Sequence, residues 1–308
     1  MLRYLFIAIA WLGAMPAITT PVQTPEGTSL LGKPLVSVPP TGEHKTRLEA
    51  DLAKAQADYD RDPASADAAI WLGRRLAYLG RFRDAIDVYS KGILRHPNEP
   101  RLYRHRGHRH ITIRKLDLAI GDLRKASQLI AGKPDEIEPD GAPNKAGIPR
   151  STLQSNIWYH LGLAQYLSGD FTAALASYRE GMKVSRVNDD MRVATSDWLY
   201  MTLRRLMRDA EARQVLEPIR EQMDILENTA YHQRLLMYKG LRSPESVLNL
   251  NTADDVQMAT QGYGVGNWYL VSGDRAKARE IFDRVVAGRA WAAFGFIAAE
   301  ADLKRGID

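Results

Sequence analysis

Like residues recur in this sequence at a fixed interval, and this interval constrains the fold more than any other feature. Three pairs lie 34 residues apart: Pro63 and Pro97, Gly73 and Gly107, and Ala85 and Ala119. A period of this length is typical of chains that stack one small structural unit many times. Each unit buries its hydrophobic face only against its neighbours, so the stack is stable as a whole. The sequence therefore predicts a repeat protein.

Two units carry the same order of small and large residues. The first contains Leu72-Gly73, Gly80, Phe82, Ala85, Tyr89 and Pro97, and the third contains Leu161-Gly162, Gly169, Phe171, Ala174 and Tyr178. Small residues suit the crossing point of two helices, glycine suits the left-handed turn between them, and proline ends the second helix. This order resembles the tetratricopeptide-repeat (TPR) family, whose unit is a helix–turn–helix. The resemblance covers most of the chain after residue 44.

The predicted fold is an all-α TPR solenoid of about five helix pairs, with N-terminal and C-terminal capping helices, over residues 44–305. The repeats are expected at about 66–99, 100–131, 155–188, 193–226 and 259–292. Apolar residues before and after them suit the two caps: Leu48, Leu52, Ala55 and Tyr59, then Trp291, Phe294, Ala298 and Leu303. The second unit departs from the pattern, since Arg114 stands where the turn glycine belongs. The alternative is an unrelated all-helical bundle.

Two insertions interrupt the period. Residues 132–154 contain four prolines and four acidic residues, so we expect an acidic loop rather than a helix. Residues 227–258 form the second interruption. It is predicted to be helical, with one helix at about 230–241 and another starting at Ser243-Pro244-Glu245.

The N-terminus has the composition of an export signal. Arg3 precedes an apolar run from Tyr4 to Met15, followed by small residues. We expect a signal peptide at 1–18, with an uncleaved anchor as the alternative, and a disordered Pro-rich linker at 19–43. The run is too short for a stable membrane span, which needs about 20 apolar residues. The predicted location is therefore periplasmic or secreted, in a bacterial cell envelope.

Signals of catalysis are absent from the sequence, and we expect no enzyme activity and no cofactor. There are no cysteines, which excludes thiolate chemistry and cysteine lipidation. The run Gly262, Gly264 and Gly266 follows no predicted strand, so it indicates close helix packing rather than a nucleotide site. The net charge of +5 is too small for its length to argue for a nucleic-acid partner.

The segment 101–115, RLYRHRGHRHITIRK, is the strongest candidate for a binding site. If it contains the first helix of the second unit, its basic face lines the concave side of the solenoid together with equivalent positions of other units. The predicted peptide-binding residues are Trp71, Arg74, Arg101, Arg104, His105, His108, Tyr159, His160, Trp198 and Arg204. Arginine forks bind carboxylates and aromatic rings supply contact area, so we expect an extended or acidic peptide as partner. The alternatives are a solvated basic face and, through His105 and His108, a metal site.

The acidic insertion follows directly after this basic unit. Asp135, Glu136, Glu138 and Asp140 are complementary in charge to it and close along the chain. We therefore expect either a lid that folds over the basic face as a built-in competitor or an ordinary surface loop.

The final third is similar to a narrower group, the bacterial TPR protein family of new lipoprotein I. The shared order is Trp198-Leu199-Tyr200, Ser243-Pro244-Glu245, Asn267-Trp268-Tyr269-Leu270, Gly273-Asp274 and residues 276–282. That resemblance implies, as an alternative, a cell-envelope adaptor that recruits proteases or peptidoglycan hydrolases through convex or dimer surfaces. The carboxylate clamp known from some TPR proteins does not match, because Ile70 and His105 occupy two of its positions.

Overall fold

The computed structural model describes residues 24–139, 141 and 143–307. The predicted signal peptide, the start of the predicted linker and Asp140 lie outside the described residues. The helices are α1 (Gly42–Arg61), α2 (Ala66–Tyr78), α3 (Phe82–Arg95), α4 (Pro100–Thr112), α5 (Leu116–Leu129), α6 (Leu153–Ser168), α7 (Phe171–Val184), α8 (Asp189–Arg205), α9 (Asp209–Leu216), α10 (Thr229–Tyr238), α11 (Pro244–Val247), α12 (Asp255–Gln257), α13 (Tyr263–Val271), α14 (Arg275–Ala287) and α15 (Phe294–Arg305). A 3-10 turn, η1 (Ser185–Val187), precedes α8, and a π-helical turn, η2 (Met258–Gly262), precedes α13. In this part of the chain no helix combines the length and the apolar character that crossing a bilayer requires.

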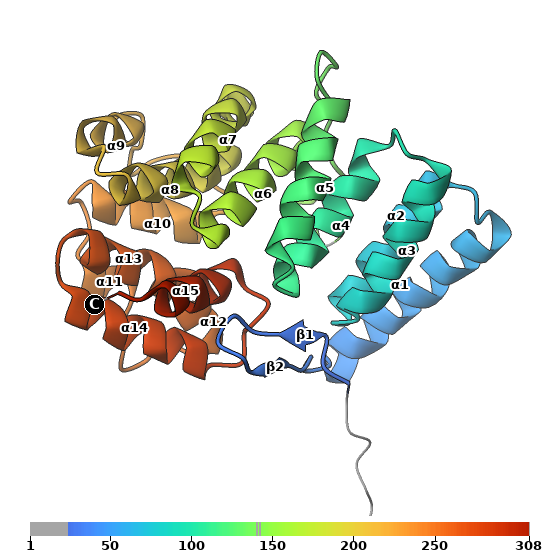
Figure 1. Cartoon of the computed structure of the whole chain (residues 1–308), viewed down its shortest axis with the longest axis horizontal. Coiled ribbons are helices and arrows are strands. Elements are labelled where there is room, and N and C mark those ends of the chain that lie inside the picture. Colours follow the sequence, from blue (N-terminus) through green and yellow to red (C-terminus); the bar gives the residue numbers. More distant parts are fainter. Residues whose placement is uncertain (1–23, 140, 142, 308) are drawn as a thin grey trace, which may run out of the picture.

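The helices form an all-α TPR solenoid, as predicted. The pairs are α2 with α3, α4 with α5, α6 with α7, α8 with α9, and α13 with α14, with α1 before them and α15 after them. The pairs follow one another around an arc, and α15 lies toward its centre (Figure 1). The first helices of successive pairs contact one another, which places them on the inner, concave face.

Each regular pair is locked by one close contact between a glycine and a large side chain. A Cβ atom on Gly73 would lie closer than 3.0 Å to the ring of Tyr89 in the partner helix. The same contact recurs between Gly107 and Leu123, Gly162 and Tyr178, and Gly266 and Phe282. The large side chain therefore fills the space that a side chain on the first helix would need, which explains why the repeat conserves this spacing within one chain.

The turn between the two helices of each pair is left-handed. The turn residues have φ values of 75° at Gly80, 64° at Arg114, 91° at Gly169, 58° at Met207 and 96° at Gly273. Glycine adopts this conformation without steric cost, whereas arginine and methionine do not. The second and fourth pairs thus keep the left-handed turn of the repeat without the glycine that favours it.

The N-terminal segment is packed, and the prediction of a disordered linker is wrong for residues 24–38. Strands β1 (Gly27–Thr28) and β2 (Pro34–Leu35) form an antiparallel hairpin. The Ser37 hydroxyl donates to the Gly80 carbonyl at 2.6 Å, and the Trp291 indole donates to the Val36 carbonyl at 2.8 Å. The hairpin therefore joins the first repeat to the C-terminal end. Its partners are distant in sequence, which is why local composition did not reveal it.

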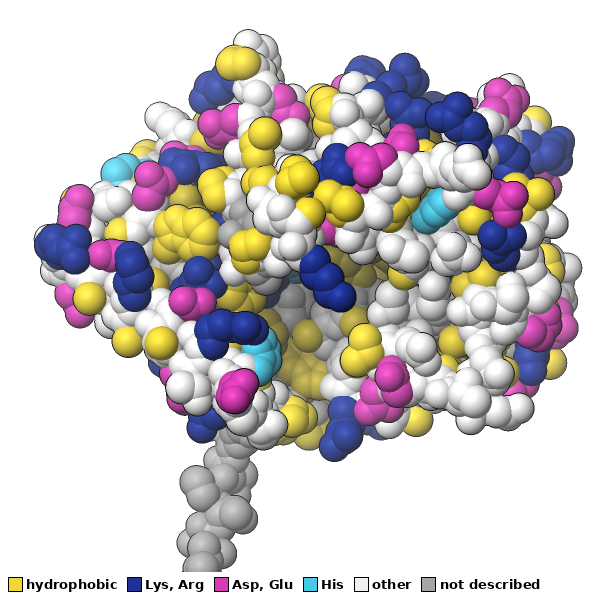
Figure 2. Space-filling view, turned by 180° about the vertical axis from the view of Figure 1, so that it is seen from behind, with side chains coloured by type: hydrophobic (Ala, Val, Ile, Leu, Met, Phe, Trp, Pro, Cys, Tyr) yellow, Lys and Arg dark blue, Asp and Glu magenta, His cyan; other side chains and the backbone are white. Residues whose placement is uncertain are grey.

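The C-terminal helix also crosses to the first half of the solenoid. Phe294, at the start of α15, lies with its ring 5.2 Å from His108 on α4 and 5.6 Å from His160 on α6. Trp291 packs edge-on against Phe82 at 5.5 Å. These contacts close the arc, so that the concave face surrounds a central hollow. Seen from behind, the hollow has hydrophobic side chains on its floor and a Lys or Arg side chain near its centre (Figure 2).

Candidate functional site

Three arginines gather on the concave face and form what we call the arginine cluster: Arg74 on α2, and Arg104 and Arg109 on α4. All three contribute to the electrostatic environment of the buried Tyr89 hydroxyl, from α3. They come together because α2 and α4 are the first helices of adjacent pairs and pack side by side. Arg104 is buried, whereas Arg74 and Arg109 are partly exposed.

The acidic insertion places one carboxylate in this cluster. Glu138 is only 6% exposed, and its Oε1 lies 3.1 Å from Nη2 of Arg104 and 3.7 Å from Nε2 of His105. The side-chain amide of Asn156, on α6, donates to the other carboxylate oxygen at 3.1 Å. The expected lid therefore contacts the basic face through Glu138, with the paired geometry that a buried charge requires.

Two main-chain carbonyls after Glu138 contact the same wall. Arg74 Nη1 donates to the Pro139 carbonyl, and Arg75 Nη1 donates to the Gly141 carbonyl, both at 2.8 Å. Gly141 approaches α2 so closely that a Cβ atom there would overlap the Tyr78 hydroxyl. The concave face thus holds one carboxylate and two main-chain carbonyls of a segment of its own chain.

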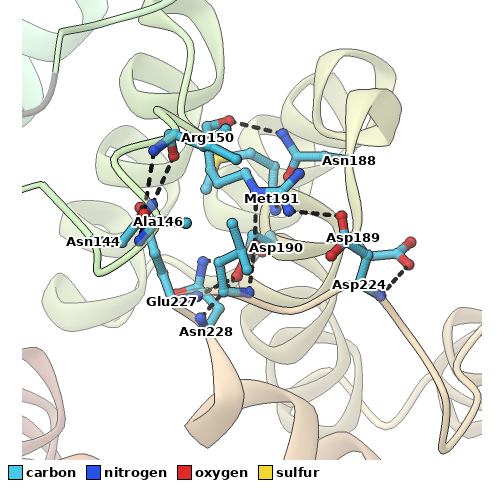
Figure 3. Close-up of polar contacts among 12 residues, drawn as sticks. Asn144, Ala146, Arg150, Asn188, Asp189, Asp190, Met191, Asp224, Glu227 and Asn228 are labelled. Atoms are coloured by element: carbon cyan, nitrogen blue, oxygen red, sulfur yellow. Dashed lines mark hydrogen bonds and ion pairs between the residues drawn. The ribbon is translucent and has the colours of Figure 1, made fainter.

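Both ends of the insertion are fixed. At its base, the Glu138 amide donates to the Ser151 carbonyl at 3.0 Å. At its far end, Asn144 donates to the Glu227 carboxylate and Arg150 to the Asp224 carboxylate, each at 2.6 Å (Figure 3).

The anchor at the far end depends on a fully buried carboxylate at the start of α8. Asp190 accepts hydrogen bonds from the amides of Leu226, Glu227 and Asn228 at 2.8–2.9 Å (Figure 3). The insertion consequently bridges the first repeat and the segment after the fourth.

The histidines predicted for the site form part of its wall. His105 stacks on Tyr89 with a ring separation of 5.7 Å, and His108 lies 4.4 Å from His160. Burial, reinforced by nearby arginines, lowers the pKa of all three well below the usual value, so the imidazoles are neutral at pH 7. Over residues 24–139, 141 and 143–307, no three His, Asp or Glu side chains are grouped as metal ligands.

Two predicted residues lie at the edge of the site. Trp71 is partly buried, with the Arg74 guanidinium 4.6 Å from its ring centroid, and it faces a cavity of about 480 Å³ between α1 and α2. Arg101 is held by Asp67 at 2.7 Å and by Glu99 at 2.8 Å. Its charge is therefore already compensated within the chain.

Three predicted residues lie apart from the arginine cluster. Trp198 is 2% exposed, which makes it a core residue and corrects the expectation that it lines an open face. Its indole donates to the Tyr159 hydroxyl at 2.8 Å, and that hydroxyl also contacts Tyr231. Arg204 contacts Asp209 at 2.9 Å and the Val271 carbonyl at 3.1 Å, so it joins α8 to α13.

Sequence reasoning missed other residues of the site. Arg109 lies one helical turn after His105 and was within reach of the same periodicity argument. Arg75 and Asn156 had no local signal, because they act on a loop whose path the sequence does not give. Phe294 was assigned to the cap, but its contact with His108 required the closure of the arc.

The contacts between glycine and a large side chain, together with the left-handed turns, define the fold as that of a TPR protein. No protein-family model matches the chain, and no curated protein matches it. Solved structures are similar in fold at low identity. YrrB, described as a TPR protein with an unusual peptide-binding site, has a TM-score of 0.44 at 14% identity, covering 77% of this chain and 92% of that chain. Pseudomonas aeruginosa PilF has a TM-score of 0.46 at 14% identity, covering 79% of this chain and 85% of that chain. A tetratricopeptide repeat protein from Parabacteroides merdae has a TM-score of 0.42 at 12% identity, covering 83% of this chain and 93% of that chain.

Proposed function

We propose that this chain is a non-enzymatic, exported binding scaffold whose concave face holds an extended acidic segment of a partner protein. The observation that carries the proposal is the way in which the face holds Glu138 to Gly141. Arg104 binds a side-chain carboxylate, while Arg74 and Arg75 bind main-chain carbonyls. An extended segment of another protein that carries an acidic residue presents the same groups, a carboxylate and main-chain carbonyls.

The chemistry of this face favours an acidic peptide whose other residues can vary. Guanidinium groups recognise carboxylates with charge-assisted hydrogen bonds, and main-chain carbonyls are common to every peptide. The neutral imidazole of His105, 3.7 Å from the Glu138 carboxylate, adds no competing positive charge. Specificity would come from the position of the acidic residue, with the rest of the segment contributing through its extended backbone.

The insertion would then act as a resident occupant that the partner displaces. A tethered segment competes at a high effective concentration, in the millimolar range for short flexible tethers. Binding of a partner in trans is therefore expected to be weaker in the native chain than in a variant that lacks Glu138. The apolar run at residues 4–15 supports export, since it has the length and flanks of a signal.

A peptide-binding measurement tests the proposal. A fluorescent peptide with the sequence of residues 134–143 is titrated with the full chain and with Glu138→Ala, and anisotropy is recorded. We expect tighter binding to Glu138→Ala. Adding Arg104→Gln should weaken that binding at least about tenfold, because a hydrogen-bonded charge pair loses one partner.

Arg213→Gln is the matched control, since Arg213 is exposed on α9, far from the cluster. It should leave the affinity unchanged. The proposal fails if Glu138→Ala does not bind the peptide, or if Arg104→Gln and Arg213→Gln behave alike. If a partner protein is still captured by the chain that carries both Glu138→Ala and Arg104→Gln, this would instead support an envelope adaptor that acts through its outer surface.

A further inference from the structure

Four other buried or partly buried arginines lie against carboxylates. The pairs are Arg106 with Asp122 at 2.7 Å, Arg114 with Glu300 at 2.9 Å, Arg205 with Asp302 at 3.0 Å and Arg234 with Asp197 at 2.8 Å. This is the expected pattern, because a guanidinium removed from water is unfavourable unless an opposite charge and hydrogen bonds compensate it.

Arg109 departs from this pattern. Its side chain is partly buried, and within the described part of the chain its guanidinium has neither an ion pair nor a hydrogen bond. The guanidinium lies over the ring of Phe82, with its carbon 5.5 Å from the ring centroid. A cation over an aromatic face is stabilised, but that contact leaves every N–H donor of the guanidinium available.

Counted over the described residues, the arginine cluster also has more positive than negative charge. Among the described residues, Arg104 pairs with the Glu138 carboxylate, whereas Arg74 donates to a carbonyl oxygen and lies over the Trp71 ring. Burial, reinforced by the charge of Arg104, lowers the pKa of Arg109 to about 10, so the side chain is still charged at neutral pH. In the described part of the chain, the concave face therefore carries more positive than negative charge beside an occupied carboxylate position.

We infer that Arg109 is a second carboxylate subsite, and that the partner segment carries two acidic residues. This inference rests on the proposed function, and it adds the spacing that the partner must have. Arg104 and Arg109 are five residues apart on α4, about 7.5 Å along the helix axis and about 140° around it, and both side chains reach the surroundings of the Tyr89 hydroxyl. An extended chain rises about 3.3 Å per residue, so acids at positions i and i+2 are about 6.6 Å apart on one side. The matching ligand is an extended peptide with a Glu-x-Glu pattern or its aspartate equivalent.

Three synthetic peptides test this spacing. They share Gly-Ser flanks and a fluorescent label, and their centres are Glu-Ala-Glu, Glu-Ala-Gln and Glu-Ala-Ala-Ala-Glu. Anisotropy titrations use the full chain carrying Glu138→Ala, so that the Arg104 position is vacant. We expect Glu-Ala-Glu to bind about tenfold more tightly than either of the other two.

Substitution of Arg109 then tests whether this residue causes the tighter binding of Glu-Ala-Glu. In the same background, Arg109→Gln should remove the advantage of Glu-Ala-Glu while leaving the affinity for Glu-Ala-Gln within about twofold. Arg109→Lys should keep part of the advantage, since it retains the charge without the planar fork. Arg83→Gln, an exposed arginine on α3, is the matched control and should change neither value.

The outcomes separate the two proposals. If Glu-Ala-Gln binds through Arg104 but Arg109→Gln does not alter the preference for two acids, the subsite is wrong and the proposed function stands. If no peptide binds, both are wrong. Should Arg109→Gln fail to fold, the comparison of the three peptides on the Glu138→Ala chain decides, and equal affinities would overturn the subsite.

Discussion

Arg114 Nε donates to Glu300 Oε2 at 2.9 Å, and this ion pair joins residues that are 186 positions apart. Both side chains are 2% exposed. Arg114 also donates through Nη2 to the Trp291 carbonyl at 2.7 Å. The residue that replaces the turn glycine of the second repeat thus fastens the C-terminal cap to the first half of the solenoid.

Removing one charge of this pair should destabilise the fold. Glu300→Gln leaves the Arg114 guanidinium buried without a carboxylate, and we expect the free energy of unfolding to fall by about 3 kcal/mol. Urea denaturation followed by circular dichroism measures the change. Glu280→Gln on α14 is the matched control, because its partner Lys277 is on the surface and such pairs contribute at most about 1 kcal/mol. Equal effects of the two substitutions would show that the pair does not hold the arc closed.

The repeat architecture was accessible from the sequence because its decisive contacts are local. Gly73 meets Tyr89 within one helix pair, and the same residue types recur at the same spacing in other units. The closure of the arc was not accessible. It depends on contacts such as that of Trp291 with Val36, whose partners are separated by most of the chain. No periodicity reports such a contact, so the hairpin was mistaken for a linker.

The turn after α8 offers a stabilising substitution. Met207 has φ 58°, and its side chain is 87% exposed, so it bears the left-handed conformation without compensating contacts. Met207→Gly should raise the free energy of unfolding by about 0.5–1 kcal/mol, since the steric cost of this conformation outweighs the extra flexibility of glycine in the unfolded chain.

The matched comparison is Arg114→Gly, at the equivalent turn of the second pair. It relieves the same strain but removes the ion pair with Glu300, so the expected change is destabilising. Thermal and urea denaturation of both variants test the contrast. Stabilisation by both, or by neither, would contradict this account of the two turns.

The candidate site was predicted in part. The register of segment 101–115 placed Arg104 and His105 on the inner face, and charge complementarity suggested that the insertion could reach them. The same register failed for Trp198, because periodicity identifies a face of a helix but not the neighbour that covers it. There, Tyr263 stacks on the indole at a ring separation of 5.8 Å.

The stability of the protein should decrease as the pH falls below 6.5. Burial lowers the pKa of His105, His108 and His160 in the folded chain, so only the unfolded chain takes up their protons as the pH passes below the ordinary value of 6.5. The stabilisation is complete above 6.5 and is lost by about 1.4 kcal/mol per pH unit for each histidine below it.

Urea denaturation at pH 7.5 and 5.5 measures this loss, which amounts to about 4 kcal/mol for three histidines as an upper limit. Arg104 and Arg109 oppose protonation of these rings, while Glu138, 3.7 Å from His105, favours it. A variant with His108→Gln and His160→Gln should retain about one third of the pH dependence. An unchanged dependence would show that other groups are responsible.

The carboxylate of Glu138 should be replaceable by one supplied from outside. Glu138→Ala leaves Arg104 buried beside His105 without its counter-ion, and we expect a loss of about 3 kcal/mol in the free energy of unfolding. A ligand that binds only the folded chain stabilises it by an amount that grows with the logarithm of its concentration, about 2.7 kcal/mol at 100 times its Kd. Addition of the peptide with the sequence of residues 134–143 should therefore restore most of the lost stability in Glu138→Ala. The same peptide with its acids replaced by amides should restore none, and it would count against the site if the two peptides acted equally.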